Sequence, residues 1–134
     1  MKLLTRDTDY AVRALIFIAG QKGERASVTQ LVKDMDIPRP FLRKILQELN
    51  RKKILRSSKG RGGGFSLALK PERIYLSDLI NIFQGSLRIN ECMFRKRACP
   101  RKGYCGLRHR LQGIEDYVVS KINGITIASL LKKG

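Results

Sequence analysis

Acidic residues are scarce in this sequence, and the shortage indicates what it binds. Of its 134 residues, 11 are Asp or Glu and 28 are Lys or Arg, so the formal net charge is +17. This balance is far outside ordinary globular composition and predicts a polyanionic partner. Nucleic acid is the first candidate, and an anionic membrane surface is the second.

Long apolar runs are missing as well. No stretch of 18 or more apolar residues occurs, so we expect no transmembrane helix. The apolar stretch from Ala14 to Gly20 follows Arg13 without a small-residue cleavage site, which is typical of a core helix and not of a signal peptide. We therefore expect a cytoplasmic protein, in which an odd number of cysteines argues against disulfide bonds.

The patterns that indicate an enzyme are also absent. The sequence has no C-x-x-C redox pair, no glycine-rich nucleotide fingerprint, and no acid–base pair placed with a nucleophile. Its single histidine is His109. We therefore expect a binding protein and not an enzyme.

What the sequence does contain is a series of amphipathic helices. Apolar residues at helical spacing predict a first helix over residues 7–21, which Asp7 or Thr8 can cap. Ser27 can cap a second helix over residues 28–35. A third begins near Pro38 to Pro40, because proline is tolerated in a first turn. Its expected buried stripe is Phe41, Leu42, Ile45, Leu46 and Leu49.

The opposite side of this third helix is basic. Arg39, Arg43 and Lys44 lie there, and a tight turn joins the helix to the one before it. This arrangement is typical of a helix-turn-helix motif, although a solvated helix in a bundle shows the same pattern.

The next segment favours the DNA-binding interpretation. Residues 54–58 and 65–69 are predicted to form two strands, joined by the glycine-rich basic tip Lys59–Gly64. Such a hairpin is the wing of a winged helix, and its glycines let the backbone approach a phosphate chain. Between Ile37 and Arg73 there are eleven Lys or Arg and two acids. The residues expected to contact double-stranded DNA are Arg39, Pro40, Arg43, Lys44, Ser58, Lys59, Arg61, Gly62 and Gly63.

Two further helices and a last turn are predicted in the C-terminal half. The first covers residues 76–83, and the second, over residues 106–122, is long and carries an apolar stripe. A long helix of this kind often pairs with its twin in a homodimer, although it can also pack back on its own domain. Thr126 can cap the last turn, residues 127–131, which could cover the dimer seam.

The predicted fold class is mainly α with a small β-hairpin. Residues 1–85 are expected to form a winged helix-turn-helix DNA-binding domain, residues 86–106 a cysteine-rich loop, and residues 107–134 a dimerisation helix with a C-terminal cap. The basic charge lies on a helix-turn-helix and a hairpin, so a membrane-surface role is disfavoured.

The loop holds all three cysteines in the pattern C-x6-C-x5-C-x3-H. Cys92, Cys99, Cys105 and His109 are a set of ligands that suits zinc or an iron–sulfur cluster. Zinc would give a CCCH-like structural site in a nucleic-acid-binding protein. Three unrelated thiols remain the simplest alternative.

The order of these motifs resembles the winged-helix transcriptional regulators of the IscR/NsrR type. The resemblance rests on the stretches at residues 8–15, 39–46, 59–67 and 123–127, together with the three-cysteine loop. It implies a homodimeric bacterial transcription factor that acts as a repressor at a palindromic operator. It also implies an iron–sulfur cluster, 2Fe–2S or 4Fe–4S, on Cys92, Cys99 and Cys105, which would sense nitric oxide, redox state, iron or cluster supply.

The resemblance leaves two candidates for the fourth ligand. In the nitric-oxide-sensing type it is an Asp of the N-terminal helix supplied by the partner subunit, and Asp9 stands at that position. In the assembly-regulator type it is a His three residues after the last Cys, where this sequence has Arg108, with His109 one residue later.

Overall fold

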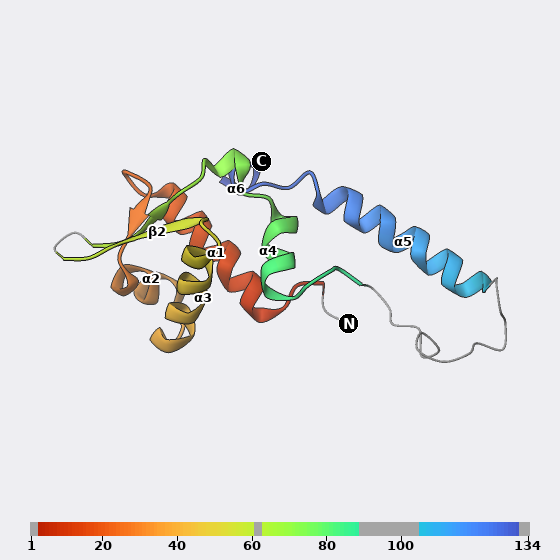
Figure 1. Ribbon diagram of the computed structural model, residues 1–134, viewed down its shortest axis with the longest axis horizontal. Helices are drawn as coiled ribbons and strands as arrows, with labels where there is room; N and C mark the ends of the chain where they lie inside the picture. Colours follow the sequence, from red (N-terminus) through yellow and green to blue (C-terminus); the bar gives the residue numbers. More distant parts are fainter. Residues whose placement is uncertain (1–2, 61–62, 89–104, 132–134) are drawn as a thin grey trace.

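The computed structural model describes residues 3–60, 63–88 and 105–131 and confirms a mainly helical winged-helix fold (Figure 1). No helix in these three ranges is long and apolar enough to cross a lipid bilayer. The elements in chain order are α1 (Arg6–Gly20), β1 (Arg25–Ala26), α2 (Val28–Met35), α3 (Arg39–Arg51), β2 (Leu55–Ser58), β3 (Gly64–Leu67), the 3-10 helix η1 (Pro71–Arg73), α4 (Leu76–Phe83), α5 (Gly106–Ile122) and α6 (Ile127–Leu131).

Helix α1 is the centre of the main hydrophobic core. Its inner side presents Ala11, Ala14, Leu15 and Ile18, which are completely buried. They belong to one apolar cluster with the buried stripe of α3, and burial of that surface is the main stabilising term. The predicted stripe of α3 is confirmed for Leu42, Ile45, Leu46 and Leu49.

The N-terminus of α1 differs from the prediction. The cap is Thr5, whose hydroxyl accepts a hydrogen bond from the Thr8 backbone N–H, and not Asp7 or Thr8. Thr8 is instead completely buried, and its hydroxyl donates to the Gln84 side chain (2.7 Å). A threonine in a first turn can cap the helix or serve a tertiary contact, and sequence alone does not separate the two roles.

The caps of α2 and α3 follow the prediction. Ser27 and Gln30 form a reciprocal capping box at the start of α2. Asp36 ends α2 in the left-handed conformation (φ 52°). Pro38 and Pro40 flank the first position of α3, so the turn between the two helices is short.

The sheet has three antiparallel strands in the order β1-β3-β2. The predicted hairpin is present as β2 and β3, with Ser58 opposite Gly64 next to the tip. The edge strand β1 pairs Arg25 with Ser66 and Ala26 with Phe65. Because β1 is only two residues long, it is too short to show an alternating pattern of apolar and polar residues, so this strand could not be predicted from the sequence.

The C-terminal helix α6 packs on its own domain. Ile127 is 1% exposed and belongs to the main core, where α6 lies against α1 and η1. Backbone hydrogen bonds from Leu76 N to Ile125 O and from Ile127 N to Ile74 O fix this segment. Ile127 thus serves the core of one chain, whereas Leu130 and Leu131 of the same helix remain exposed, and the expectation that this turn covers a dimer seam stays a prediction.

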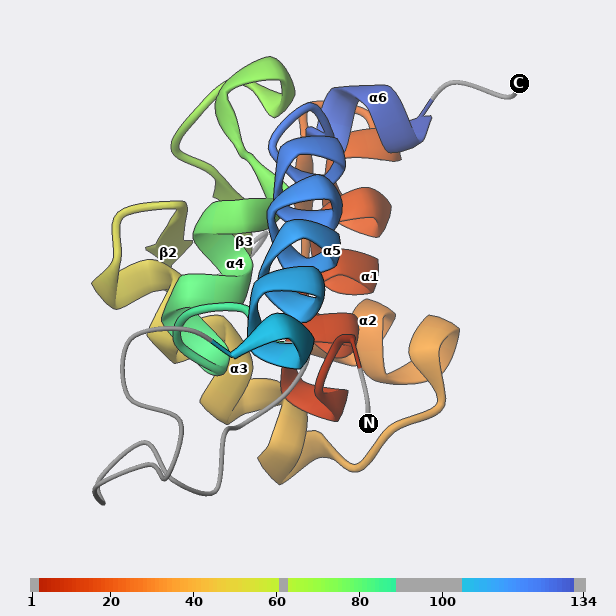
Figure 2. The same cartoon turned by 90° about the vertical axis from the view of Figure 1, so that its right-hand side faces the viewer.

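Helix α5 extends away from the rest of the molecule in Figure 1, and in Figure 2, viewed from that side, it lies in front of α1 and α4. Its last residue, Ile122, is buried in a small cluster with Leu76 and Ile80 of α4. Toward its N-terminus the apolar residues are exposed, with Leu107 at 69%, Ile114 at 53% and Tyr117 at 64%. The helix thus packs on its own domain at its C-terminal end and presents apolar side chains to solvent elsewhere.

Candidate DNA-binding surface and cysteine segment

The outer side of α3 carries the side chains that sequence analysis assigned to DNA. Arg39, Pro40, Arg43 and Lys44 are all exposed. Arg39 donates a hydrogen bond through Nη2 to the Thr29 hydroxyl (3.2 Å), which links the start of α3 to α2. The guanidinium of Arg43 and the ammonium of Lys44 are exposed enough to contact phosphates or base edges.

The prediction that Phe41 is buried was wrong. Its side chain is 43% exposed, and the Arg6 guanidinium lies over the ring, 4.8 Å from the centroid. Phe41 lies at the margin of the apolar stripe in the first turn of α3, where the ring meets the start of α1 instead of the core. The cation–π contact covers one ring face and leaves the ring partly exposed beside the basic side of α3.

The wing depends on two glycines. The Gly63 N–H donates to Gly60 O (2.9 Å), and a Cβ on Gly63 would lie 2.7 Å from the carbonyl oxygens of both Gly60 and Ser58. Gly64 has φ +147°, and a Cβ there would lie 2.3 Å from Ala26 O. Ser58 and Lys59 are exposed, whereas Arg61 and Gly62 lie outside the described residues.

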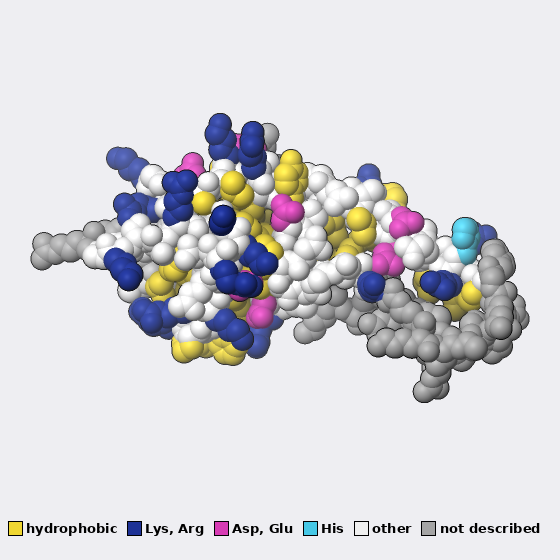
Figure 3. All heavy atoms as spheres, in the orientation of Figure 1, with side chains coloured by type: hydrophobic (Ala, Val, Ile, Leu, Met, Phe, Trp, Pro, Cys, Tyr) yellow, Lys and Arg dark blue, Asp and Glu magenta, His cyan; other side chains and the backbone are white. Residues whose placement is uncertain are grey.

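Basic side chains surround the base of the wing. Figure 3 shows Lys and Arg side chains above and below the projecting hairpin at that end of the molecule. Exposed cations on the sheet that carries the wing include Arg25 of β1 and Arg56 of β2. Such clustering produces the positive potential that attracts a phosphate backbone.

The cysteine segment is described only at its end. Cys92 and Cys99 lie outside the described residues, and Cys105 is a partly exposed free thiol at the N-cap of α5. His109 is exposed one turn later, and its backbone N–H donates to the backbone carbonyl of Cys105 (3.0 Å). Among the residues that the structure describes, no three His, Cys, Asp or Glu side chains form a group that could hold a metal ion.

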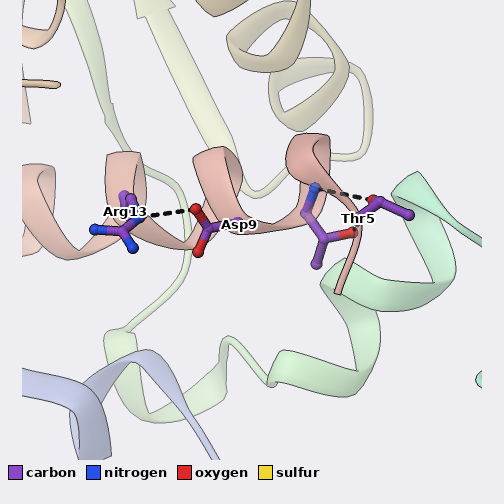
Figure 4. Close-up of polar contacts among 4 residues, drawn as sticks. Thr5, Asp9 and Arg13 are labelled. Atoms are coloured by element: carbon purple, nitrogen blue, oxygen red, sulfur yellow. Dashed lines mark hydrogen bonds and ion pairs between the residues drawn. The ribbon is translucent and has the colours of Figure 1, made fainter. Parts of the chain in front are cut away.

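Asp9 lies on the outer side of α1 and is paired with Arg13 (Figure 4). Arg13 Nε donates to Asp9 Oδ2 at 2.8 Å, and the Asp9 side chain is 40% exposed. The hydrogen bond to the carboxylate raises the pKa of Arg13 above its ordinary value. Within one chain, therefore, the Asp9 carboxylate is accessible and already has a cationic neighbour.

Gln84 is a structural residue that sequence analysis missed. Its Oε1 accepts hydrogen bonds from Thr5 N (2.9 Å) and from the Thr8 hydroxyl, and its Nε2 donates to Leu3 O (3.1 Å). Gln84 is the C-cap of α4, so these bonds fasten the end of α4 to the start of α1. A glutamine at the end of a helix gives no sequence signal for such a contact.

The fold and the basic surface define a winged-helix DNA-binding protein. The comparison with protein families agrees, because residues 4–133 match the Rrf2 family, described as iron-dependent transcriptional regulators. The chain belongs to this family. Its relatives are transcriptional regulators and not enzymes, as the sequence predicted.

Two curated relatives show how far the similarity extends. An HTH-type transcriptional regulator of Aquifex aeolicus is 31% identical over 91% of this chain and 86% of its own length. The HTH-type transcriptional regulator NsrR of Bacillus subtilis is 30% identical over 96% of this chain and 90% of its own length. The similarity therefore includes both the winged helix and the cysteine segment.

Solved structures show the same fold at lower identity. The global cysteine regulator CymR of B. subtilis superposes with a TM-score of 0.81 at 20% identity, covering 98% of this chain and 97% of that chain. IscR of T. potens gives a TM-score of 0.76 at 21% identity, covering 98% and 86%. At these identities the likeness concerns the fold alone.

Proposed function

We propose that the protein is a homodimeric transcriptional repressor whose affinity for DNA is set by an iron–sulfur cluster on Cys92, Cys99 and Cys105. The observation that carries the proposal is the place of the cysteine segment in the chain. It follows α4, which Gln84 fastens to α1, and it ends at Cys105, the N-cap of α5. A group bound there would join the DNA-binding domain to the exposed helix.

The DNA contacts follow from the exposed cations. Arg39, Arg43 and Lys44 would enter the major groove with α3, and Lys59, Arg61, Gly62 and Gly63 would place the wing on the adjacent backbone, with Ser58 at the end of β2 beside them. Pro40 is the second residue of α3, and its fixed φ suits the first turn of the helix. Phosphate contacts supply most of the affinity, and base-edge contacts supply the choice of site.

The exposed side of α5 supports a dimer. Leu107, Ile114 and Tyr117 would leave water on pairing, and full burial of one such side chain contributes about 1.5–3 kcal/mol. His109, Arg110 and Gly113 complete a shallow hollow along the same helix. Two winged helices held by paired α5 helices would read a palindromic site.

The donor set suits an iron–sulfur cluster. Three thiolates would hold it, and Cys105 is accessible at the start of α5. When bound, the cluster supplies a centre that reacts with oxidants or nitric oxide. Either Asp9 of a second chain or His109 would give the fourth ligand. Asp9 would have to exchange its Arg13 partner for the cluster, whereas His109 already lies one turn from Cys105.

The test is anaerobic purification from iron-replete cells, followed by a visible spectrum and analysis of iron, acid-labile sulfide and zinc on one sample. We expect a coloured protein with iron and sulfide that loses both in Cys99→Ala, while a Ser86→Ala control keeps them. One zinc per chain without colour would contradict the cluster. It would favour the second candidate, a structural zinc site, which the closeness of Cys105 and His109 also allows.

A further inference from the structure

A cleft at the base of the wing carries cations that none of the DNA contacts above include. It has a volume of about 580 Å³. Gln21 and Lys22 line it from the end of α1, Arg25 from β1, Ser27 and Gln30 from the start of α2, and Gly63 from the wing. Among the described residues, no acidic side chain lines the cleft, and the neighbouring Glu24 is exposed outside it.

Arg25 is held in a defined place within this cleft. It lies on the edge strand β1 opposite Ser66, and its side chain crosses β3 to reach β2. There Nη2 donates a hydrogen bond to the Ser58 hydroxyl at 3.4 Å. The guanidinium therefore lies beside the last residue of β2, next in the chain to the wing cation Lys59, and the residue remains exposed.

The wing and the cleft are in close backbone contact. Gly64 of β3 packs so closely on the backbone of β1 that a Cβ would lie 2.9 Å from Ser27 Cα. This contact joins the wing to the start of α2 without an intervening side chain. The backbone that carries Arg25 therefore lies directly beside the strand that leads out of the wing.

We propose that Lys22 and Arg25 form a third contact with the DNA backbone, beside the contact made by the wing. The inference rests on the proposed binding of DNA. A guanidinium matches the geometry of a phosphate and can bind it through two donors, while the ammonium of Lys22 adds charge. Ser58 then acts as a positioning residue that holds Arg25. The strand β1 and the wing lie at the same end of the molecule, so one duplex can meet both (Figure 1).

The test compares two charge-matched double variants. Lys22→Gln with Arg25→Gln removes the cleft cations, and Lys70→Gln with Arg73→Gln removes two exposed cations beside η1. Binding to a fluorescent duplex is measured by anisotropy over a range of KCl concentrations. The salt slope is the slope of the logarithm of the binding constant against the logarithm of the salt concentration. We expect this slope to be smaller in magnitude by about two in the cleft variant than in the parent. The affinity at 0.1 M salt should fall by on the order of 10-fold per lost phosphate contact. The control pair should leave the slope unchanged.

Three results would overturn the proposal. In the first, the cleft variant keeps the salt slope of the parent. In the second, the control pair lowers the salt slope as much as the cleft variant does. The third result would show that the cleft is a site for a free anion. In that case inorganic phosphate, added at constant ionic strength, would raise the melting temperature of the parent but not of the cleft variant, and the two proteins would have equal salt slopes for duplex binding. A parent protein that binds no duplex would instead refute the proposed function, and the inference with it. Circular dichroism checks that each variant is folded.

A double-mutant cycle tests the role of Ser58. Ser58→Ala should weaken binding in the parent and have little effect in the Arg25→Gln background, because its role depends on Arg25. Additive effects would mean that Ser58 contacts DNA itself and would overturn its positioning role.

Discussion

At the scale of single residues, the Asp9–Arg13 pair makes the fourth-ligand question testable. The pair is an exposed ion pair one helical turn apart, and such pairs contribute only about 0.3–0.5 kcal/mol to stability. Removing the Asp9 charge should therefore leave the fold intact, and a change in the cluster can be assigned to the missing carboxylate.

Asp9→Asn is expected to alter the visible spectrum of the cluster-loaded protein and to speed the loss of its iron in air. Asp7→Asn, in the same first turn, is the matched control and should behave as the parent. If Asp9→Asn keeps the parental spectrum and rate while His109→Gln changes both, the fourth ligand is His109.

Gly64→Ala tests the close packing of the wing on β1. The variant would need a Cβ 2.3 Å from Ala26 O at φ +147°, and overpacking of this kind costs about 1–3 kcal/mol. We expect a matching loss in the free energy of unfolding, measured with urea. Gly20→Ala, where nothing lies within 4 Å of the added atom, should change it by less than about 0.5 kcal/mol. Equal effects would contradict the packing.

At the scale of elements, the sequence predicted most helices well and the contacts between them poorly. The stripe of α3 and the Ser27 cap follow from local spacing, and they were correct. Gln84 meets Thr5 across 79 residues, and β1 forms only because β3 lies beside it. Phe41 was misplaced because its environment is set by Arg6 of another helix. Long-range contacts of this kind leave no local pattern.

The same reason limits what could be predicted of the candidate site. The exposure of Lys59, Arg43 and Lys44 could be predicted from charge and spacing, because basic residues stand out in a helical or strand pattern, and their contact with DNA stays a prediction. Arg25 was missed, since its place at the base of the wing depends on pairing between β1 and β3.

The wing is the element whose contribution to DNA binding is easiest to isolate. Lys59→Ala together with Arg61→Ala should lower the salt slope for duplex binding by about one to two, at roughly one unit per lost phosphate contact. The control pair at Lys70 and Arg73 should keep the slope. An unchanged slope in the wing variant would remove the wing from the interface.

Helix α5 can be tested as the dimer interface with one charge. Ile114→Glu should produce monomers in sedimentation, because it places a carboxylate in the exposed apolar side of α5. Gln112→Glu adds the same charge on the side of α5 roughly opposite Ile114, about 200° around the helix axis from it, and should leave the dimer intact. An unaltered dimer in Ile114→Glu would place the interface elsewhere.

At the scale of the whole molecule, the main feature is the connection between two surfaces. The DNA-binding domain and the exposed helix α5 are packed together through the small cluster of Leu76, Ile80 and Ile122. The cysteine segment spans the same two parts, from the end of α4 to the start of α5. Under the proposed function, a group bound by the segment would change how two DNA-binding domains are spaced in a dimer, and spacing decides whether both fit one operator.

The central claim is that a bound cluster controls DNA affinity. The most direct measurement is the anaerobic affinity of one preparation for its operator duplex, before and after the cluster is removed with a chelator, with Cys99→Ala measured alongside. We predict a change of at least about 10-fold on removal, equivalent to about 1.4 kcal/mol, and no change in the variant. Equal affinities of the loaded and stripped protein would contradict the account.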